Sequence, residues 1–161
     1  TTAPTITWYK HTSVSHTAGT SISGLSLGTV TAGAWGYFKV VSCVPASNDI
    51  NNAKFWLYDT VAALSGGGSV SLGNASRKWW FKAGVTTGLS SSLFSKTGAS
   101  LGTTLACPYH ATNNSVGAGL SLGTVTSGTH SNYIYISPQP ATSAYNGTYT
   151  DFAFQLSYDF T

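Results

Sequence analysis

Charge is scarce in this sequence. Only 7% of its 161 residues are charged, against roughly 25% in an average soluble domain. All four acidic residues are Asp, and the chain contains neither Glu nor Met. Because Glu is a common residue of exposed helices, we expect few helices on the surface. The net charge of +3 attracts phosphates only weakly, so the sequence disfavours a nucleic-acid-binding protein.

Long apolar stretches are lacking as well. No run of about 18 apolar residues occurs, so we expect no membrane-spanning segment. No apolar stripe with helical spacing continues for three turns. The chain opens on neither an initiator Met nor a signal peptide. Its first residues therefore suggest a mature, processed product, which favours an extracellular or cell-surface protein.

Hydroxyl groups supply the polarity that charge does not. The chain has 23 Ser and 23 Thr, and its five Trp, nine Tyr and seven Phe argue against a disordered chain. At this length one domain can bury an adequate core.

Because few carboxyl groups are present to titrate near their usual pKa of about 4, the sequence predicts that folding stability changes little in acid.

The strongest internal pattern is a repeat. The segment GLSLGTVTAG at residues 24–33 recurs as GLSLGTVTSG at residues 119–128, with nine of ten positions identical at an offset of 95. Weaker similarity extends the match to residues 16–59 and 110–159. The pattern predicts a duplication within one domain.

Alternating residues predict strands. Residues 35–43, 132–137 and 148–158 alternate with a period near two, and Gly, Pro and Asn separate them. The sequence therefore predicts an all-β fold in which residues 15–161 form a single β-sandwich of the Ig-like or jelly-roll type.

Residues 1–14 lie outside both copies of the repeat. Ile6 and Trp8 fall on one face of a predicted strand, and Thr7 and Tyr9 fall on the other. A strand without a partner presents unpaired backbone groups, so we predict a detached donor strand that inserts Ile6 and Trp8 into a neighbouring subunit. The predicted acceptor edge is residues 147–160 or residues 119–126. A structure in which this strand pairs within its own subunit would remove the basis for the filament hypothesis.

The chain has two cysteines, Cys43 and Cys107, and neither belongs to a metal-binding pair. In an extracellular protein they favour a Cys43–Cys107 disulfide; two buried free thiols are the alternative. Three Asn-X-Ser/Thr sequons predict glycosylation in turns. They begin at Asn74, Asn113 and Asn146.

No pattern of catalytic residues stands out. Ser26 and Ser121 each lie in Gly-X-Ser-X-Gly, but the hydrolase elbow needs a helix after the serine, and Thr-Val-Thr and another Gly follow here. The four histidines show no zinc motif, which indicates solvated or hydrogen-bonded side chains in loops. They are His11, His16, His110 and His130. We expect no enzyme activity, no metal and no cofactor.

Residues 77–82 (RKWWFK) combine cations with aromatic rings. One interpretation is an edge strand that turns Trp79 or Phe81 to the core and Trp80 to solvent. The other is a platform on which a sugar stacks, through Trp80 or Trp35.

With these features the chain resembles extracellular filament subunits that assemble by donor-strand complementation, in particular the thread and bundling-pilus subunits of thermophilic and thermoacidophilic archaea. The segment at residues 1–14, the alternating segment at residues 147–160 and the low charge carry the resemblance. Residues 147–158 also resemble the closing strand of chaperone-usher pilins of the spore-coat-U type. The resemblance implies a glycosylated β-sandwich subunit of an open homopolymer that serves adhesion or biofilm formation, with identical subunits, glycans or other filaments as partners.

Other functions stay open at this point. A carbohydrate-binding or adhesive β-sandwich, a viral jelly-roll capsid or decoration protein, and a secreted enzyme or inhibitor all fit an all-β chain with a hydroxyl-rich surface. The filament hypothesis differs from them because it requires a strand that leaves its own subunit.

Overall fold

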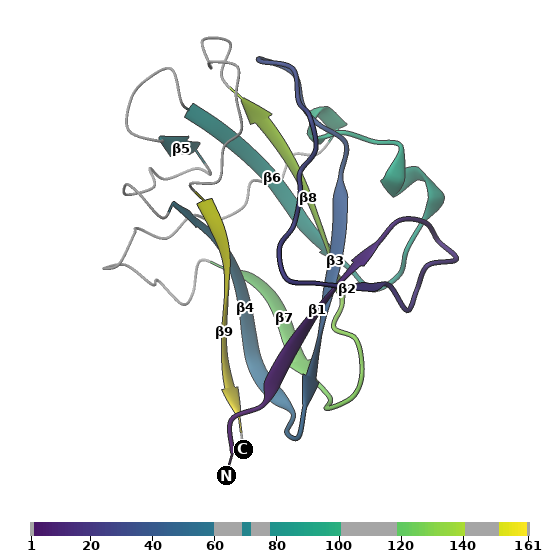
Figure 1. The fold of residues 1–161 in the computed structure, drawn as a ribbon, viewed down its shortest axis with the longest axis vertical. Coiled ribbons are helices and arrows are strands. Elements are labelled where there is room, and N and C mark those ends of the chain that lie inside the picture. The colour runs from purple at the N-terminus through teal and green to yellow at the C-terminus, as the bar shows by residue number, and fades with distance from the viewer. Residues whose placement is uncertain (1, 60–68, 72–77, 101–118, 141–151, 161) are drawn as a thin grey trace.

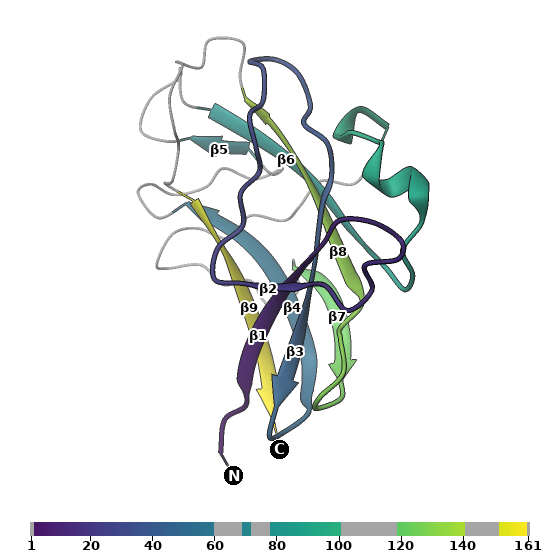
Figure 2. The same cartoon turned by 45° about the vertical axis from the view of Figure 1, so that its right-hand side comes forward.

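Two antiparallel sheets make up most of the described residues in this computed structural model (Figures 1 and 2). The structure describes residues 2–59, 69–71, 78–100, 119–140 and 152–160. Within these ranges the helices are two short 3-10 turns, Ser91–Phe94 and Gly98–Ser100, and neither has the length or apolar character to cross a membrane. The all-β prediction is confirmed.

The larger sheet has six strands in the order β2-β1-β3-β8-β6-β5. Their bounds are β1 (Thr5–His11), β2 (Thr20–Ile22), β3 (Lys39–Ala46), β5 (Ser69–Ser71), β6 (Lys78–Thr86) and β8 (Tyr133–Pro140). The interpretation of residues 77–82 as an edge strand is wrong for Lys78–Trp80, because β5 pairs with these residues on the side of β6 opposite to β8.

The smaller sheet has the order β7-β4-β9, with β4 spanning Ile50–Asp59, β7 spanning Leu120–Val125 and β9 spanning Phe152–Phe160. The register of β4 shifts between Ile50 and Lys54, where Asn52 has a positive φ of 52°, as expected for a β-bulge. The predicted alternation of β9 is confirmed for its described side chains. Phe154, Leu156 and Tyr158 pack against the core.

Both sheets contribute to one hydrophobic core. From the larger sheet come Val41, Cys43, Phe81, Ala83, Ile134 and Ile136, and from the smaller sheet come Ile50, Ala53, Phe55, Leu122 and Val125. Phe81 has none of its surface exposed, which confirms the core position expected for it. Because each sheet supplies about half of this cluster, neither sheet can bury its apolar face alone.

The two copies of the repeat hold the ends of each other's strands. The Gly33 amide donates a hydrogen bond to the Pro140 carbonyl, and Gly128, 95 residues later, donates one to the Pro45 carbonyl, both over 2.8 Å. Gly33 and Gly128 have positive φ angles of 81° and 80°, which glycine adopts without steric cost. The ten-residue motif nevertheless differs between copies, because residues 120–125 form β7 whereas residues 25–31 belong to no strand.

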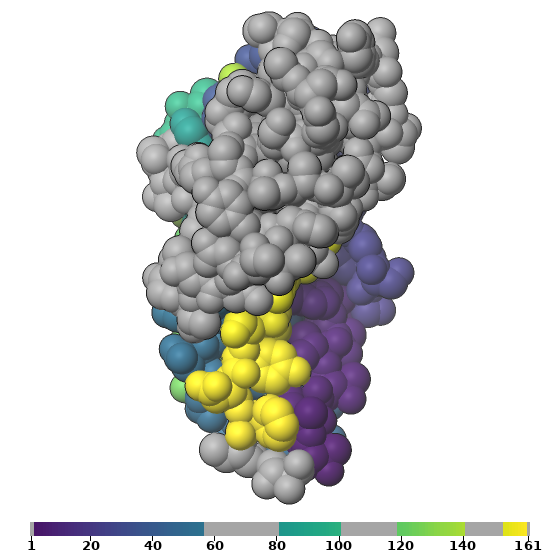
Figure 3. Space-filling model, turned by 90° about the vertical axis from the view of Figure 1, so that its left-hand side faces the viewer, coloured from purple at the N-terminus to yellow at the C-terminus, as the bar shows by residue number. Residues whose placement is uncertain are grey.

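Strand β1 is not a detached donor strand. It pairs with β3 along its whole length, from Thr5 opposite Ala46 to His11 opposite Val40, and with β2 on its other side. Within the described residues neither predicted acceptor edge pairs with it: β7 and β9 both pair with β4, although β1 and β9 lie side by side on one face of the molecule (Figure 3). A terminal strand that reaches an open edge of its own sheet satisfies its backbone groups there, and the sequence pattern does not reveal which edge is open.

Candidate functional site

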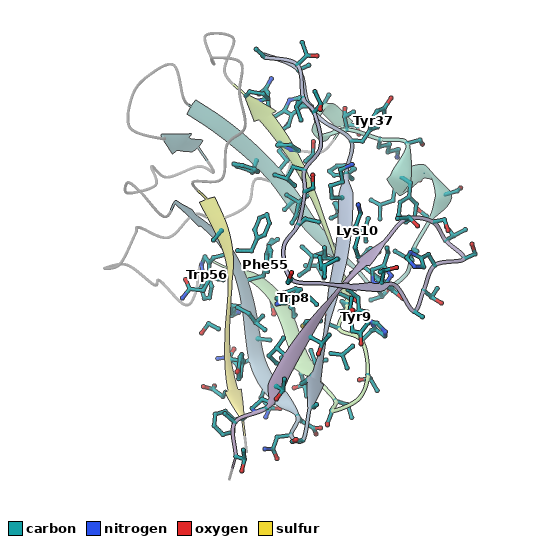
Figure 4. The ribbon with its side chains drawn as sticks, in the orientation of Figure 1. Trp8, Tyr9, Lys10, Tyr37, Phe55 and Trp56 are labelled. Carbon is teal, nitrogen blue, oxygen red and sulfur yellow. The ribbon has the colours of Figure 1, made fainter. Side chains whose placement is uncertain are left out.

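The N-terminal hairpin, residues 5–22, docks on the edge of β3. Trp8 lies opposite Cys43 in the ladder, and the Trp8 ring meets the Phe55 ring edge-on with centroids 5.9 Å apart (Figure 4). Ile6 and Trp8 both pack against the core. The two side chains predicted to insert into a subunit do so, but the subunit is their own.

One connection leads from this hairpin to β3. Residues 23–38 lead from β2 to β3. The amides of Gly33 and Gly36 in this connection bond to the β8 carbonyls of Pro140 and Pro138. The backbone bonds of the connection to β8 therefore begin at Gly33. Leu25 and Leu27 pack against the core before that point, so a hinge at residues 23–32 has to release these two side chains.

A chain of side-chain hydrogen bonds ties the hairpin to the body of the molecule. The Nε2 atom of His11, at the end of β1, lies 2.7 Å from the Ser42 hydroxyl of β3. The same hydroxyl lies 2.8 Å from Nδ1 of His130, in the connection between β7 and β8. His11 is 2% exposed and Ser42 is not exposed at all, so the His11–Ser42 bond is shielded from water, whereas His130 at the other end of the chain is half-buried.

The direction of each bond in this chain follows from its acceptors. The Nδ1 atom of His11 lies 2.7 Å from the His16 carbonyl oxygen, which can only accept, so Nδ1 carries the proton of the neutral ring. Nε2 is then unprotonated and accepts from the Ser42 hydroxyl. Since that hydroxyl has a single hydrogen, Nδ1 of His130 must donate to it.

The loop between β1 and β2 is organised around His16. The Thr12 amide donates to His16 Nδ1 over 3.0 Å, and His16 Nε2 lies 3.2 Å from the Thr20 hydroxyl. Gly19 lets the loop pass close to His11, because a Cβ atom there would lie 2.9 Å from His11 Cε1 and the φ angle is 71°. The loop thus places the His16 carbonyl where His11 needs an acceptor.

Burial lowers the pKa of His11. Desolvation is the main reason that the pKa of His11 lies below its usual value of 6.5. The bond to the His16 carbonyl works against that change, while repulsion from His130 and His16 adds to it. His11 is therefore neutral at pH 7, and a charge on it is unfavourable in the folded protein.

The cluster is not arranged for nucleophilic or metal chemistry. Ser42 lies between two imidazoles, but its complete burial keeps the hydroxyl away from any substrate. No group of three His, Cys, Asp or Glu side chains is placed to hold a metal ion within the described ranges. What the chain of bonds does is connect the hairpin to β3 and to the loop before β8.

Sequence reasoning missed this cluster. It expected the histidines in loops, whereas His11 is a buried strand residue, and His110 lies outside the described residues. Ser42 and His130 are separated by 88 residues. The only signal in the sequence was that His11 shares a strand face with Thr7 and Tyr9, and this signal does not identify its partners.

The predicted disulfide is not formed at Cys43. Its thiol is free and fully buried, and burial raises its pKa above the usual value. Cys43 faces the core beside Trp8. Cys107, the predicted partner, lies outside the described residues, as do the three sequon residues Asn74, Asn113 and Asn146.

Trp35 does not offer an open platform for a sugar. The Lys82 ammonium lies 4.8 Å from the centre of its ring, and the ring packs so closely on Gly98 that a Cβ atom there would lie 2.6 Å from it. Stacking on a sugar needs a free ring face, so the sugar-platform interpretation loses Trp35. The side chain of Trp80 is outside the described set.

Comparison with known proteins adds no relative to this description: no protein-family model matches the chain, and neither the curated proteins nor the solved structures contain a significant match.

Proposed function

We propose that this protein is a non-enzymatic structural subunit of an extracellular filament, a β-sandwich that joins identical subunits head to tail by exchanging its N-terminal hairpin. Pairing of β1 within its own subunit removes the basis of the detached-donor form of this proposal. The observation that supports the exchange form is that the β1–β2 hairpin covers the edge of β3 and packs Ile6 and Trp8 against the core. The same edge would accept β1 from a second copy.

Exchange conserves nearly all of the contacts that hold β1. Burying Ile6 and Trp8 contributes roughly 2–3 kcal/mol each, and the ladder bonds contribute roughly 1 kcal/mol each, whichever subunit supplies the strand. The hinge at residues 23–32 reaches about 33 Å when extended. Because donor and acceptor surfaces differ, repeated exchange in one direction gives an open fibre.

Self-pairing of β1 is common to two kinds of protein: a monomer that exchanges its hairpin, and a monomer that never polymerises. In the proposed assembly, β1 is not detached: it pairs within its own subunit before assembly and with a neighbouring subunit afterwards. The reciprocal bonds between repeat copies support a second part of the proposal, that the domain arose by internal duplication.

A cross-linking experiment tests the exchange. Thr7 and Val44 lie directly opposite each other in β1 and β3, so the double substitution Thr7→Cys and Val44→Cys, made with Cys43→Ala and Cys107→Ser, allows one disulfide across that pair. In an assembly that exchanges hairpins, oxidation links each subunit to the next. We expect a ladder of covalent oligomers on a non-reducing gel.

The control is a cysteine pair that stays within one subunit. Lys54 and Ser157 are opposite each other in β4 and β9, and the variant Lys54→Cys with Ser157→Cys should give only an intrachain bridge in the same assembly. If the Thr7/Val44 pair also gives only cross-linked monomers in material that forms filaments, hairpin exchange is wrong. If no filaments form under any condition, the filament function is wrong.

Glycosylation belongs to the same proposal, because the sequons that begin at Asn74, Asn113 and Asn146 are acceptor sequences for N-linked glycans in an extracellular protein. Protein from its native source should have an intact mass above the 16.7 kDa of the bare chain. Equality with that mass would contradict this part of the proposal.

A further inference from the structure

We propose that the His11–Ser42–His130 chain is a proton-sensitive clasp, which fastens the N-terminal hairpin to the body while the imidazoles are neutral and loosens the His11 end of β1 when they take up protons. The inference rests on the proposed function in that the loosened hairpin is the element that exchanges. The opening itself can be measured on the single subunit.

The clasp crosses the boundary between the moving and the fixed part. His11 and His16 belong to the hairpin, whereas Ser42 and His130 belong to the body. Ring contacts run along the same boundary: Tyr9 meets His130, and His11 meets Tyr133 of β8, each with centroids 4.9 Å apart. Loosening this cluster therefore frees the end of β1 that leads into the loop.

A proton added to His11 disrupts this chain of hydrogen bonds because each N–H and O–H group in it already donates to an acceptor. Once Nε2 of His11 is protonated, it points an N–H at the Ser42 oxygen, and the Ser42 hydrogen loses its acceptor. The His130 N–H points at the same oxygen. A buried donor without an acceptor is costly, so the protonated cluster favours a conformation in which His11 leaves its site.

Among the described residues, no carboxylate contacts His11 to offset this cost with a negative charge. The titratable side chains that contact it are His16, His130 and Tyr133, and Tyr9 contacts His130. None of these side chains is a carboxylate. The two imidazoles beside His11 lie within about 6 Å of it, with centroid distances of 5.8 and 6.1 Å, so successive protons repel one another.

Hydrogen exchange on the intact protein tests the clasp. The amides of β1 should exchange at least about tenfold faster at about pH 5 than at about pH 7.5, after correction for the intrinsic rates, because the loss of one buried hydrogen bond has roughly that effect on local opening. The amides of β4, measured in the same sample, should show a clearly smaller change. This internal control needs no variant.

A variant then links the response to the cluster. Asn retains a donor near the Nδ1 position and does not titrate, so the double substitution His11→Asn and His130→Asn should remove most of the pH response of β1. An equal pH response of β1 and β4 in the unsubstituted protein, or an undiminished response in a folded double variant, would overturn the clasp.

Microscopy of the same samples separates the two proposals. Acid-induced opening of β1 without filaments would support the clasp and contradict the filament function. Filaments without acid-induced opening would retain the filament function and overturn the clasp.

Discussion

Gly36 and Pro138 are joined by a backbone hydrogen bond of 2.8 Å, and Ser131 and Cys43, each 95 positions away from one of them in the sequence, are joined by a bond of the same length. Both bonds run from a repeat-related segment to a central strand of the six-stranded sheet. The bonds from Gly33 to Pro140 and from Gly128 to Pro45 follow the same pattern. The two copies of the repeat therefore bind equivalent positions of β8 and β3. Substitutions in the turns that make these bonds should therefore lower the free energy of unfolding.

Substituting Gly128 should destabilise the protein through its backbone alone. Its φ angle is 80°, and no atom lies within 4 Å of an added Cβ, so Gly128→Ala should cost about 1–2 kcal/mol of unfolding free energy by strain. Gly24 is the matched control, because it has the same open surroundings without the positive φ. Urea unfolding should leave Gly24→Ala near the unsubstituted protein, and equal stabilities of the two variants would contradict the prediction.

Folding stability should fall with acid below pH 6.5. Since the pKa of His11 is lower in the folded protein than its usual 6.5, the unfolded chain binds the proton more readily. The stabilisation is complete above pH 6.5 and is lost as the pH falls toward the folded-state pKa. Urea midpoints measured from about pH 8 to pH 5 should decline, contrary to the flat dependence expected from the scarcity of acids. A flat profile would show that His11 titrates normally.

The histidine tautomers provide a direct test of the hydrogen-bond directions. At about pH 8, where histidine is neutral, nitrogen chemical shifts should show the proton of His11 and of His130 on Nδ1 and that of His16 on Nε2. These assignments follow from the His16 carbonyl and from the Thr12 amide. Finding the His11 proton on Nε2 would reverse the chain and remove the basis of the clasp.

The Cys43 thiol should be inert in the native protein. In the variant Cys107→Ser it is the only thiol, its side chain is fully buried, and its raised pKa leaves little thiolate. A thiol reagent at about pH 8 should label it only after unfolding in urea, with one equivalent. In the unsubstituted protein, absence of any thiol after unfolding without reductant would instead reveal the disulfide that this structure lacks at Cys43.

Truncating Phe55 should be among the most damaging single changes. Its ring is 1% exposed, stacks on Phe154 with centroids 5.4 Å apart and meets Trp8 of the hairpin. Phe55→Ala should cost about 3–5 kcal/mol. Tyr37 is an aromatic control that is 61% exposed, and Tyr37→Ala should change the unfolding free energy by no more than about 0.5 kcal/mol. Comparable losses in thermal or urea unfolding would contradict the assigned core.

Local patterns in the sequence indicated several strands and which of their side chains turn inward, although the same motif forms β7 at residues 120–125 and no strand at residues 25–31. The alternation around Phe154, Leu156 and Tyr158 and the pairing of Ile6 with Trp8 on one face follow from the period of two in a strand, and the structure agrees. The absence of helical stripes likewise determined the all-β class. These features depend on neighbours within a few residues, so one sequence suffices to read them.

Only the tertiary structure decided which strands pair with each other and which distant side chains meet. Ladder hydrogen bonds join backbone groups that are the same in every residue, so the sequence did not show that β1 belongs beside β3. The His11–Ser42–His130 chain forms because three separate segments converge, two of whose members are 88 residues apart. The same convergence buries Cys43 beside Trp8, its partner in the β1–β3 ladder, as a free thiol. Contacts between distant segments depend on how the whole chain satisfies its backbone and buries its apolar faces at once, and no local pattern carries that information.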